Sequence, residues 1–164
     1  MGVVVVYLGT RRGATRSQDE RAAQRLESVR VAGLFRGRLF HQGTQGRLNS
    51  ASYTAFLQQV LEQTTAPIYL IQDGARYHTS QATQAFFAAH ADRLTVSQLP
   101  SYSPDYNPIE KLWKQVKQEE THLVYFPTFD ALREKVEPAL LKFARRAEAI
   151  LSLCGLPTEL ARAA

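Results

Sequence analysis

Cysteine is almost absent from the sequence, and so are long apolar runs. The 164 residues include one cysteine, Cys154, which rules out an internal disulfide framework, and no Cys/His cluster suggests a zinc site. The apolar run Val3–Leu8 is too short for the hydrophobic part of a signal peptide or for a membrane span, and its arginines follow it rather than precede it. We therefore expect a cytoplasmic protein with no membrane partner.

Acidic residues are fewer than basic ones. Apolar residues make up 45% of the chain, which is enough for the core of one domain. The 20 Lys and Arg residues against 15 Asp and Glu residues give a formal net charge of +5. This excess favours a polyanionic partner such as nucleic acid, but an ordinary basic protein has the same balance. Charge alone leaves both interpretations open.

The start of the chain offers little material for a core. The β-branched run Val3–Leu8 predicts a strand. Residues 9–28 are polar and rich in arginine, with Leu26 as their only large aliphatic residue. Such a segment buries little apolar surface, so we expect a mobile loop or a poorly packed helix there.

The rest of the chain has the periodicity of a mixed α/β domain, without internal repeats or linkers. Strands are expected at Val29–Phe35, Arg38–Gly43, Ile68–Gln72 and Leu94–Leu99. A tight Arg36-Gly37 turn should join the first two of them. Helices are expected to begin at Asn49 or Ser50, at about Ser80, after Pro108, and at Thr128 or Asp130.

The helices differ in how clearly they mark a buried face. The first has apolar residues at helical spacing, namely Tyr53, Phe56, Leu57, Val60 and Leu61. The second has a stripe of small and aromatic residues, namely Ala82, Ala85, Phe86 and Ala89. Pro138 should break or kink the last helical region, because it lacks an amide donor and clashes with the preceding turn.

Asp73 follows the most apolar of the predicted strands, Ile68–Gln72. Ligands of open α/β sheets collect beyond the carboxyl ends of the strands, so an acid at this position is well placed to bind a metal ion. Gly74 lets the chain turn and permits close approach of a substrate. A plain Asp-Gly turn is the structural alternative.

Glu110 lies at the start of a predicted helix. With Asn107 as N-cap and Pro108 as the first helical residue, Glu110 could simply complete a capping box. On the helical wheel Lys114 and Lys117 lie about 40° and about 20° from it. Such a face suits a metal ligand flanked by phosphate contacts, and it equally suits a solvated face with an ion pair.

Several cationic or titratable residues lie near these two acids. The candidates for contacts with a DNA backbone are Arg76, His78, Lys111, Lys114 and Lys117. The alternative for the charged ones is simple solvation. His78 could also assist the site or cap the helix that follows it.

Two segments carry a family resemblance. Residues 68–78 read IYLIQDGARYH, and residues 99–110 read LPSYSPDYNPIE, followed by Trp113. Both resemble the core of the DDE superfamily endonuclease domain, in its bacterial insertion-sequence branch related to mariner-like transposases. Weaker similarity covers roughly residues 29–155.

This resemblance implies both a fold and an activity. The fold is RNase H-like (integrase-type), a mixed sheet flanked by helices. The activity is DNA strand cleavage and strand transfer in transposition, with Asp73 and Glu110 as catalytic ligands of Mg²⁺ or Mn²⁺. The implied partners are DNA, as transposon ends and target, and a second copy or an intact transposase. The protein would lie at the nucleoid when bound to DNA.

The chain departs from the family pattern at its first acid. The family carries this acid on the first strand, whereas Val3–Leu8 contains none, so we expect that strand to be degenerate or missing. Asp19 and Glu20 form an acidic pair, but among Arg and Gln residues, and Asp19 is a disfavoured replacement. The helix-turn-helix with which such transposases read their ends is also missing from this sequence.

The expected organisation is therefore that of an impaired catalytic fragment. Residues 1–28 form a degenerate or mobile segment, 29–155 a partial catalytic domain and 156–164 a tail. One alternative is a non-catalytic nucleic-acid-binding remnant that partners intact transposase. Another is a receiver-type domain with Asp73 as phosphate acceptor, which is disfavoured because that chemistry needs an acidic pair after the first strand.

Overall fold

A five-stranded mixed sheet forms the centre of the computed structural model, which describes residues 4–12, 26–33, 38–45, 49–100, 107–153, 155 and 157–158. The strand order across the sheet is β3-β2-β1-β4-β5. The strands are β1 (Val4–Arg12), β2 (Leu26–Gly33), β3 (Arg38–Gln45), β4 (Ile68–Gln72) and β5 (Leu94–Gln98). Strand β2 pairs antiparallel with both β1 and β3, while β4 runs parallel to both β1 and β5.

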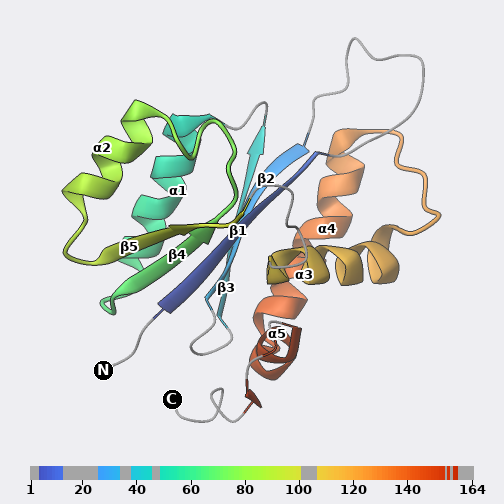
Figure 1. Cartoon of the computed structure of the whole chain (residues 1–164). Helices are drawn as coiled ribbons and strands as arrows, with labels where there is room; N and C mark the ends of the chain where they lie inside the picture. Colours follow the sequence, from blue (N-terminus) through green and yellow to red (C-terminus); the bar gives the residue numbers. More distant parts are fainter. Residues whose placement is uncertain are drawn as a thin grey trace.

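Helices cover both faces of this sheet. They are α1 (Ser50–Glu62), α2 (Gln81–Ala89), α3 (Pro108–Val116), the π-helical turn η2 (Lys117–Thr121), α4 (Phe129–Ala144) and α5 (Ala147–Leu153). Helices α1 and α2 lie on one side of the sheet, and α3, α4 and α5 on the other (Figure 1). No helix in the described part of the chain is both long and apolar enough to cross a membrane.

The two sides of the sheet carry separate cores. Phe40 packs with α1 and β4 in one cluster, and its neighbour Leu39 packs with α3, α4 and α5 in the other. This alternation follows from the two-residue period of a strand, in which successive side chains point to opposite faces. The predicted buried stripe of α1, from Tyr53 to Leu61, is confirmed.

Strand β1 corrects an expectation about the start of the chain. The first strand is present and occupies the central position between β2 and β4, so of the two expected states, degenerate or missing, the second is wrong. Strand β1 continues to Arg12, and β2 begins as early as Leu26. These extensions consist mainly of polar residues, and their pairing from Thr10↔Val29 to Arg12↔Glu27 is made by backbone groups. A hydropathy pattern does not report such pairing. The strand still has no acid.

The predicted helix starts are confirmed by their caps. Asn49 accepts a hydrogen bond from the Ser52 backbone N–H at 2.9 Å. Ser80 caps α2, and Thr128 accepts from the Ala131 backbone N–H at 3.2 Å at the start of α4. Each cap satisfies one of the backbone donors that a helix start leaves unpaired.

Two expectations about helix interiors are wrong in part. The buried residues of α2 are Thr83 and Phe87, and of the predicted stripe only Phe86 packs against the core, while its alanines are exposed. Helix α4 continues through Pro138 to Ala144, so the proline does not break it, and a kink at Pro138 stays a prediction. Pro138 is exposed, and the buried residues Ala139, Leu140 and Phe143 that follow it anchor the helix to the core. The predicted Arg36-Gly37 turn lies outside the described residues.

Candidate functional site

Asp73 lies directly after β4, at the carboxyl end of a strand with parallel neighbours on both sides. The pairing of β4 with the next strand extends to this end, because the Leu99 backbone N–H donates to the Gln72 carbonyl at 2.7 Å. The Asp73 side chain is 47% exposed. Its Oδ1 atom accepts from the Ala75 backbone N–H at 3.1 Å, which fixes the chain in an Asx turn.

His78 closes the loop that Asp73 opens. Its Nδ1 lies 2.8 Å from Asp73 Oδ1 and 2.9 Å from the Asp73 carbonyl oxygen. Its backbone N–H donates to the Ala75 carbonyl at 2.9 Å. The ring is only 1% exposed, so the structure places His78 against Asp73 and away from solvent.

Two aromatic rings pack against the His78 imidazole. The ring centroid of Tyr53 is 4.5 Å from that of His78, and the centroid of Tyr77 is 4.3 Å from it. The Tyr53 hydroxyl donates a hydrogen bond to Gln72 Oε1, and Gln72 is itself buried. We call Tyr53, Gln72, Tyr77 and His78 the strand-end cluster. The cluster includes Gln72, the residue before Asp73, and His78, which contacts the Asp73 carboxylate.

The strand-end cluster sets the ionisation of two of these groups. The hydrogen bond from His78 lowers the pKa of the Asp73 carboxyl, and the Ala75 N–H lowers it further, although partial burial raises it. Burial raises the pKa of the Tyr53 hydroxyl, and Tyr77 and Asp73 add to this rise. At neutral pH Asp73 is therefore a carboxylate, and Tyr53 is a neutral donor.

The neighbour of Gly74 in the structure is the side chain of Gln98, whereas the sequence predicts close approach of a substrate. A Cβ atom at this position would lie 3.0 Å from Nε2 of Gln98, at the end of β5. The missing side chain therefore lets the loop after β4 pass close to the Gln98 side chain. Close approach of a substrate to Gly74 stays a prediction.

Glu110 lies in the first turn of α3 and is half-buried. Its backbone N–H donates to the carbonyl of Asn107 at 3.1 Å, and Asn107 is buried. Helix α3 contacts β1, the strand next to β4. The convergence of the Glu110 and Asp73 carboxylates stays a prediction.

The candidate DNA contacts differ in exposure. Arg76, Lys111, Lys114 and Lys117 are exposed, so their charges are open to phosphate or to water. His78 is buried, and it could touch a DNA backbone only by leaving Asp73. The DNA contacts themselves stay predictions.

A third acid does not join the pair within the part of the chain that the structure describes. There, no three His, Cys, Asp or Glu side chains are grouped so that they could hold a metal ion. Asp19 and Glu20 lie outside the described residues.

The sequence interpretation missed the role of Tyr53 and Gln72. The helical spacing predicts Tyr53 only as one member of the apolar stripe of α1. A signal was present, because a tyrosine in a fully buried stripe needs a partner for its hydroxyl group. A glutamine at the end of an apolar strand is a natural acceptor, but the sequence does not tell that the two meet.

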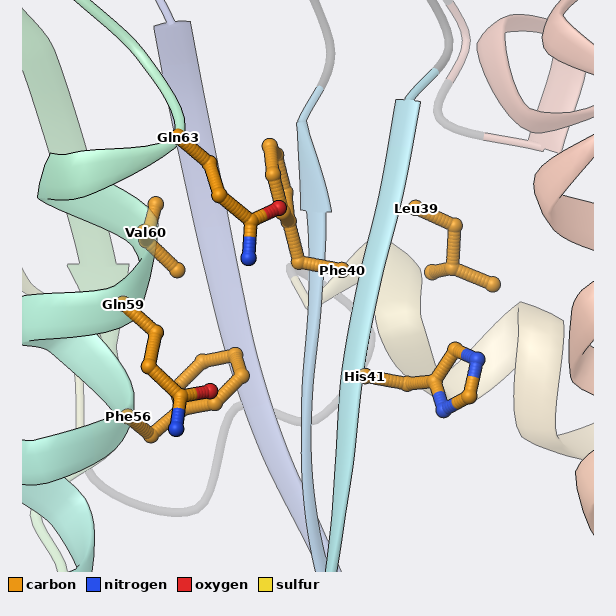
Figure 2. A pocket seen from close by; sticks show the side chains of 7 residues that line it. All are labelled: Leu39, Phe40, His41, Phe56, Gln59, Val60 and Gln63. Carbon is orange, nitrogen blue, oxygen red and sulfur yellow. The ribbon is translucent and has the colours of Figure 1, made fainter.

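One hollow of about 170 Å³ opens between α1 and β3. Phe40, Phe56 and Val60 lie between the helix and the sheet, while Leu39 and His41 project from the other side of β3 (Figure 2). Gln59 and Gln63 complete the lining. The predicted site residues do not line this hollow, so it is separate from the Asp73 site.

Solved structures share this fold at low sequence identity. The catalytic domain of Mos1 mariner transposase, in its structure with Raltegravir and Mg, has 13% identity and a TM-score of 0.65, over 98% of this chain and 82% of that one. The Mos1 paired-end complex with the left transposon end gives 12% identity and a TM-score of 0.64, over 98% of this chain and 55% of that one.

A chain of the simian T-cell lymphotropic virus intasome in complex with PP2A regulatory subunit B56 gamma gives 11% identity and a TM-score of 0.55, over 82% of this chain and 46% of that one. No curated protein matches the chain. The predicted mixed α/β, RNase H-like fold is thereby confirmed. The model of the DDE superfamily endonuclease matches residues 4–133, most of the chain, and the protein therefore belongs to that family, as its two motifs predicted.

Proposed function

We propose that this chain is a catalytic-domain fragment of a DDE transposase in which Asp73 and Glu110 are the metal ligands. Its reaction would be cleavage of transposon ends and strand transfer into target DNA, at a rate reduced by the missing first acid. Its partners would be DNA and a second copy or an intact transposase. A catalytic domain that begins only at residue 29 is not kept, because β1 (Val4–Arg12) lies at the centre of the sheet and β2 begins at Leu26. We keep as proposals an end of the domain at residue 155 and a cytoplasmic, nucleoid-associated location.

The observation that carries this proposal is the ionisation, exposure and fixed orientation of the Asp73 carboxylate. Its carboxylate is ionised, half-exposed and fixed at Oδ1 by Ala75 and His78, at the carboxyl end of a parallel strand. Carboxylate oxygens are the hard donors that Mg²⁺ and Mn²⁺ prefer, so the side chain fits such an ion. Helix α3, which carries Glu110 in its first turn, contacts β1, the strand beside β4, and this supports a shared site without locating the Glu110 carboxylate.

Each residue of the proposed site has a distinct task. Asp73 would bind through its exposed oxygen, and Glu110 would add a second carboxylate from α3. When bound, divalent ions would activate the attacking water or 3′-hydroxyl and stabilise the leaving oxygen. The exposed cations Arg76, Lys111 and Lys114 would neutralise phosphates and orient the DNA backbone.

The second candidate is a non-catalytic DNA-binding remnant. Strand β1, which carries the first acid in the family, has none here, and the described residues hold no group of three metal-binding side chains. Two-metal chemistry depends on placing the attacking and leaving oxygens, and displacements near 1 Å cost on the order of 100-fold in rate. DNA binding depends on distributed positive charge instead, which does not need that geometry.

A nicking assay on supercoiled plasmid with Mn²⁺ separates the two. We expect weak nicking by the parent chain, its loss in Asp73→Ala and Glu110→Ala, and no change in the controls Asp92→Ala and Glu134→Ala, which are exposed acids. Salt-sensitive DNA binding should persist in all five proteins. Nicking absent even from the parent would support the remnant, and nicking that survives in both site variants would contradict the assignment of the two acids.

A further inference from the structure

We propose that His78 is a positioning residue that holds Asp73 through Nδ1–H, so that the free Oδ2 oxygen faces a divalent cation. The inference rests on the proposed function for its metal. It changes the role of His78 from a contact with DNA to the orientation of the carboxylate.

The protonated nitrogen of His78 follows from its partners. Nδ1 lies 2.8 Å from Asp73 Oδ1 and 2.9 Å from the Asp73 carbonyl oxygen. A carbonyl oxygen and a carboxylate oxygen both accept hydrogen bonds and donate none. Nδ1 must therefore carry the hydrogen, and the neutral ring is the Nδ1–H tautomer.

Two neighbouring tyrosine rings and burial restrict the orientation of the His78 ring. Tyr53 and Tyr77 lie with centroids 4.5 Å and 4.3 Å from that of His78, and the imidazole is 1% exposed. Tyr77 is itself anchored, because the Thr83 hydroxyl donates to its carbonyl oxygen at 2.6 Å. A flip of the ring would break the bond to Asp73 inside a packed slot, so Nδ1 stays on the carboxylate.

The two oxygens of Asp73 are thereby made different. Oδ1 receives both the Ala75 N–H and the His78 Nδ1–H. Oδ2 has no hydrogen bond from the described residues, on a side chain that is 47% exposed. Partners of this kind, which orient a ligand without touching the metal, typically change metal affinity by about 10-fold to 100-fold when they are removed.

Two substitutions separate the hydrogen bond from the bulk of the ring. Asparagine places an N–H at the same number of bonds from Cβ as Nδ1, whereas glutamine places it one bond further out. We expect His78→Asn to retain Mn²⁺ affinity within about 3-fold, and His78→Gln to lose roughly 10-fold. Free Mn²⁺ is measured by its electron paramagnetic resonance signal, and circular dichroism checks that each variant is folded.

The second measurement is nitrogen-15 NMR of the metal-free wild-type chain, which reports which ring nitrogen of His78 carries the hydrogen. A purely structural role of His78 would not determine this tautomer. We expect Nδ1 of His78 to be protonated. The Nε2–H tautomer would overturn the inference, and so would equal loss of affinity in folded His78→Asn and His78→Gln. If no Mn²⁺ binds to the wild type, the proposed function fails, and the tautomer still decides whether His78 holds Asp73. If neither variant folds, the tautomer alone decides.

Discussion

Tyr53 on α1 donates a buried hydrogen bond to the side chain of Gln72, the last residue of β4. The bond joins a helix to the strand end one residue before Asp73. Both side chains are buried, at 0% and 2% exposure, so neither can turn to water if its partner is removed. The position of the strand end therefore depends on a polar contact inside the core.

Replacing this hydroxyl should lower the stability of the fold. Tyr53→Phe leaves Gln72 Oε1 without its donor, and an unsatisfied buried acceptor costs about 1–3 kcal/mol. Urea denaturation measures the free energy of unfolding. Tyr125→Phe is the matched control, because Tyr125 is 83% exposed, and it should leave the stability unchanged. Equal stability of the two variants would mean that the bond between Tyr53 and Gln72 contributes nothing.

The low pKa of Asp73 predicts a dependence of stability on pH. The hydrogen bond from His78 lowers the carboxyl pKa in the folded state, so the folded protein binds the proton less readily than the unfolded chain does. This stabilisation is present above the unfolded pKa, about 3.9, and is lost as the pH falls through the lower folded value.

Asp73→Asn tests this, because its amide oxygen still accepts hydrogen bonds but does not titrate. The stability difference between wild type and Asp73→Asn should shrink as the pH falls below about 4, where the carboxyl group becomes protonated. Urea titrations at several pH values measure it. A difference that is the same at every pH would contradict the assigned direction of the shift.

Gly74 should tolerate a side chain better when its neighbour is shortened. A Cβ at Gly74 would lie 3.0 Å from Nε2 of Gln98, the far end of an exposed and flexible side chain. We expect Gly74→Ala to cost less than about 1 kcal/mol, and Gln98→Ala in the same chain to recover it. Thermal unfolding of the single and double variants gives the comparison.

Gly155→Ala is a useful contrast to that pair. Gly155 has φ +71° with open space around its Cβ position, so its cost arises from the backbone alone, about 1 kcal/mol. The Gln98→Ala change should not recover it. Recovery of both glycine variants by Gln98→Ala would show that the effect at Gly74 is not a local contact.

The exposed lysines of α3 and η2 should set the salt dependence of DNA binding. Each lysine that contacts a phosphate contributes about 0.9 to the slope of log affinity against log salt. Removing Lys111, Lys114 and Lys117 together should reduce the slope by roughly 2 to 3. Lys135→Ala is the control, since Lys135 is paired with Glu120 at 3.3 Å. Fluorescence anisotropy with duplex DNA at several salt concentrations measures the slopes.

The sequence predicted the strand that ends at Gln72 and the helix that begins after Asn49 because both have strong local signals, an apolar run and a cap. It did not predict that β1 continues through Thr10 to Arg12, since backbone pairing leaves no mark on polarity. It also identified Asp73, with His78 as a residue that could assist the site, but not the buried contact between Tyr53 and Gln72. The contact between Tyr53 and Gln72 joins residues far apart in the chain, and tertiary packing alone brings them together.

Paramagnetic broadening of amide NMR signals at substoichiometric Mn²⁺ tests directly whether Asp73 and Glu110 share a metal ion. Signals near Asp73, such as those of Gly74 and Ala75, should broaden together with signals near Glu110, such as those of Lys111 and Leu112. Both sets should be spared in Asp73→Ala, and Asp92→Ala should behave as the wild type. Broadening around only one of the two acids would contradict a shared metal site, and with it the assignment of Asp73 and Glu110 as a catalytic pair.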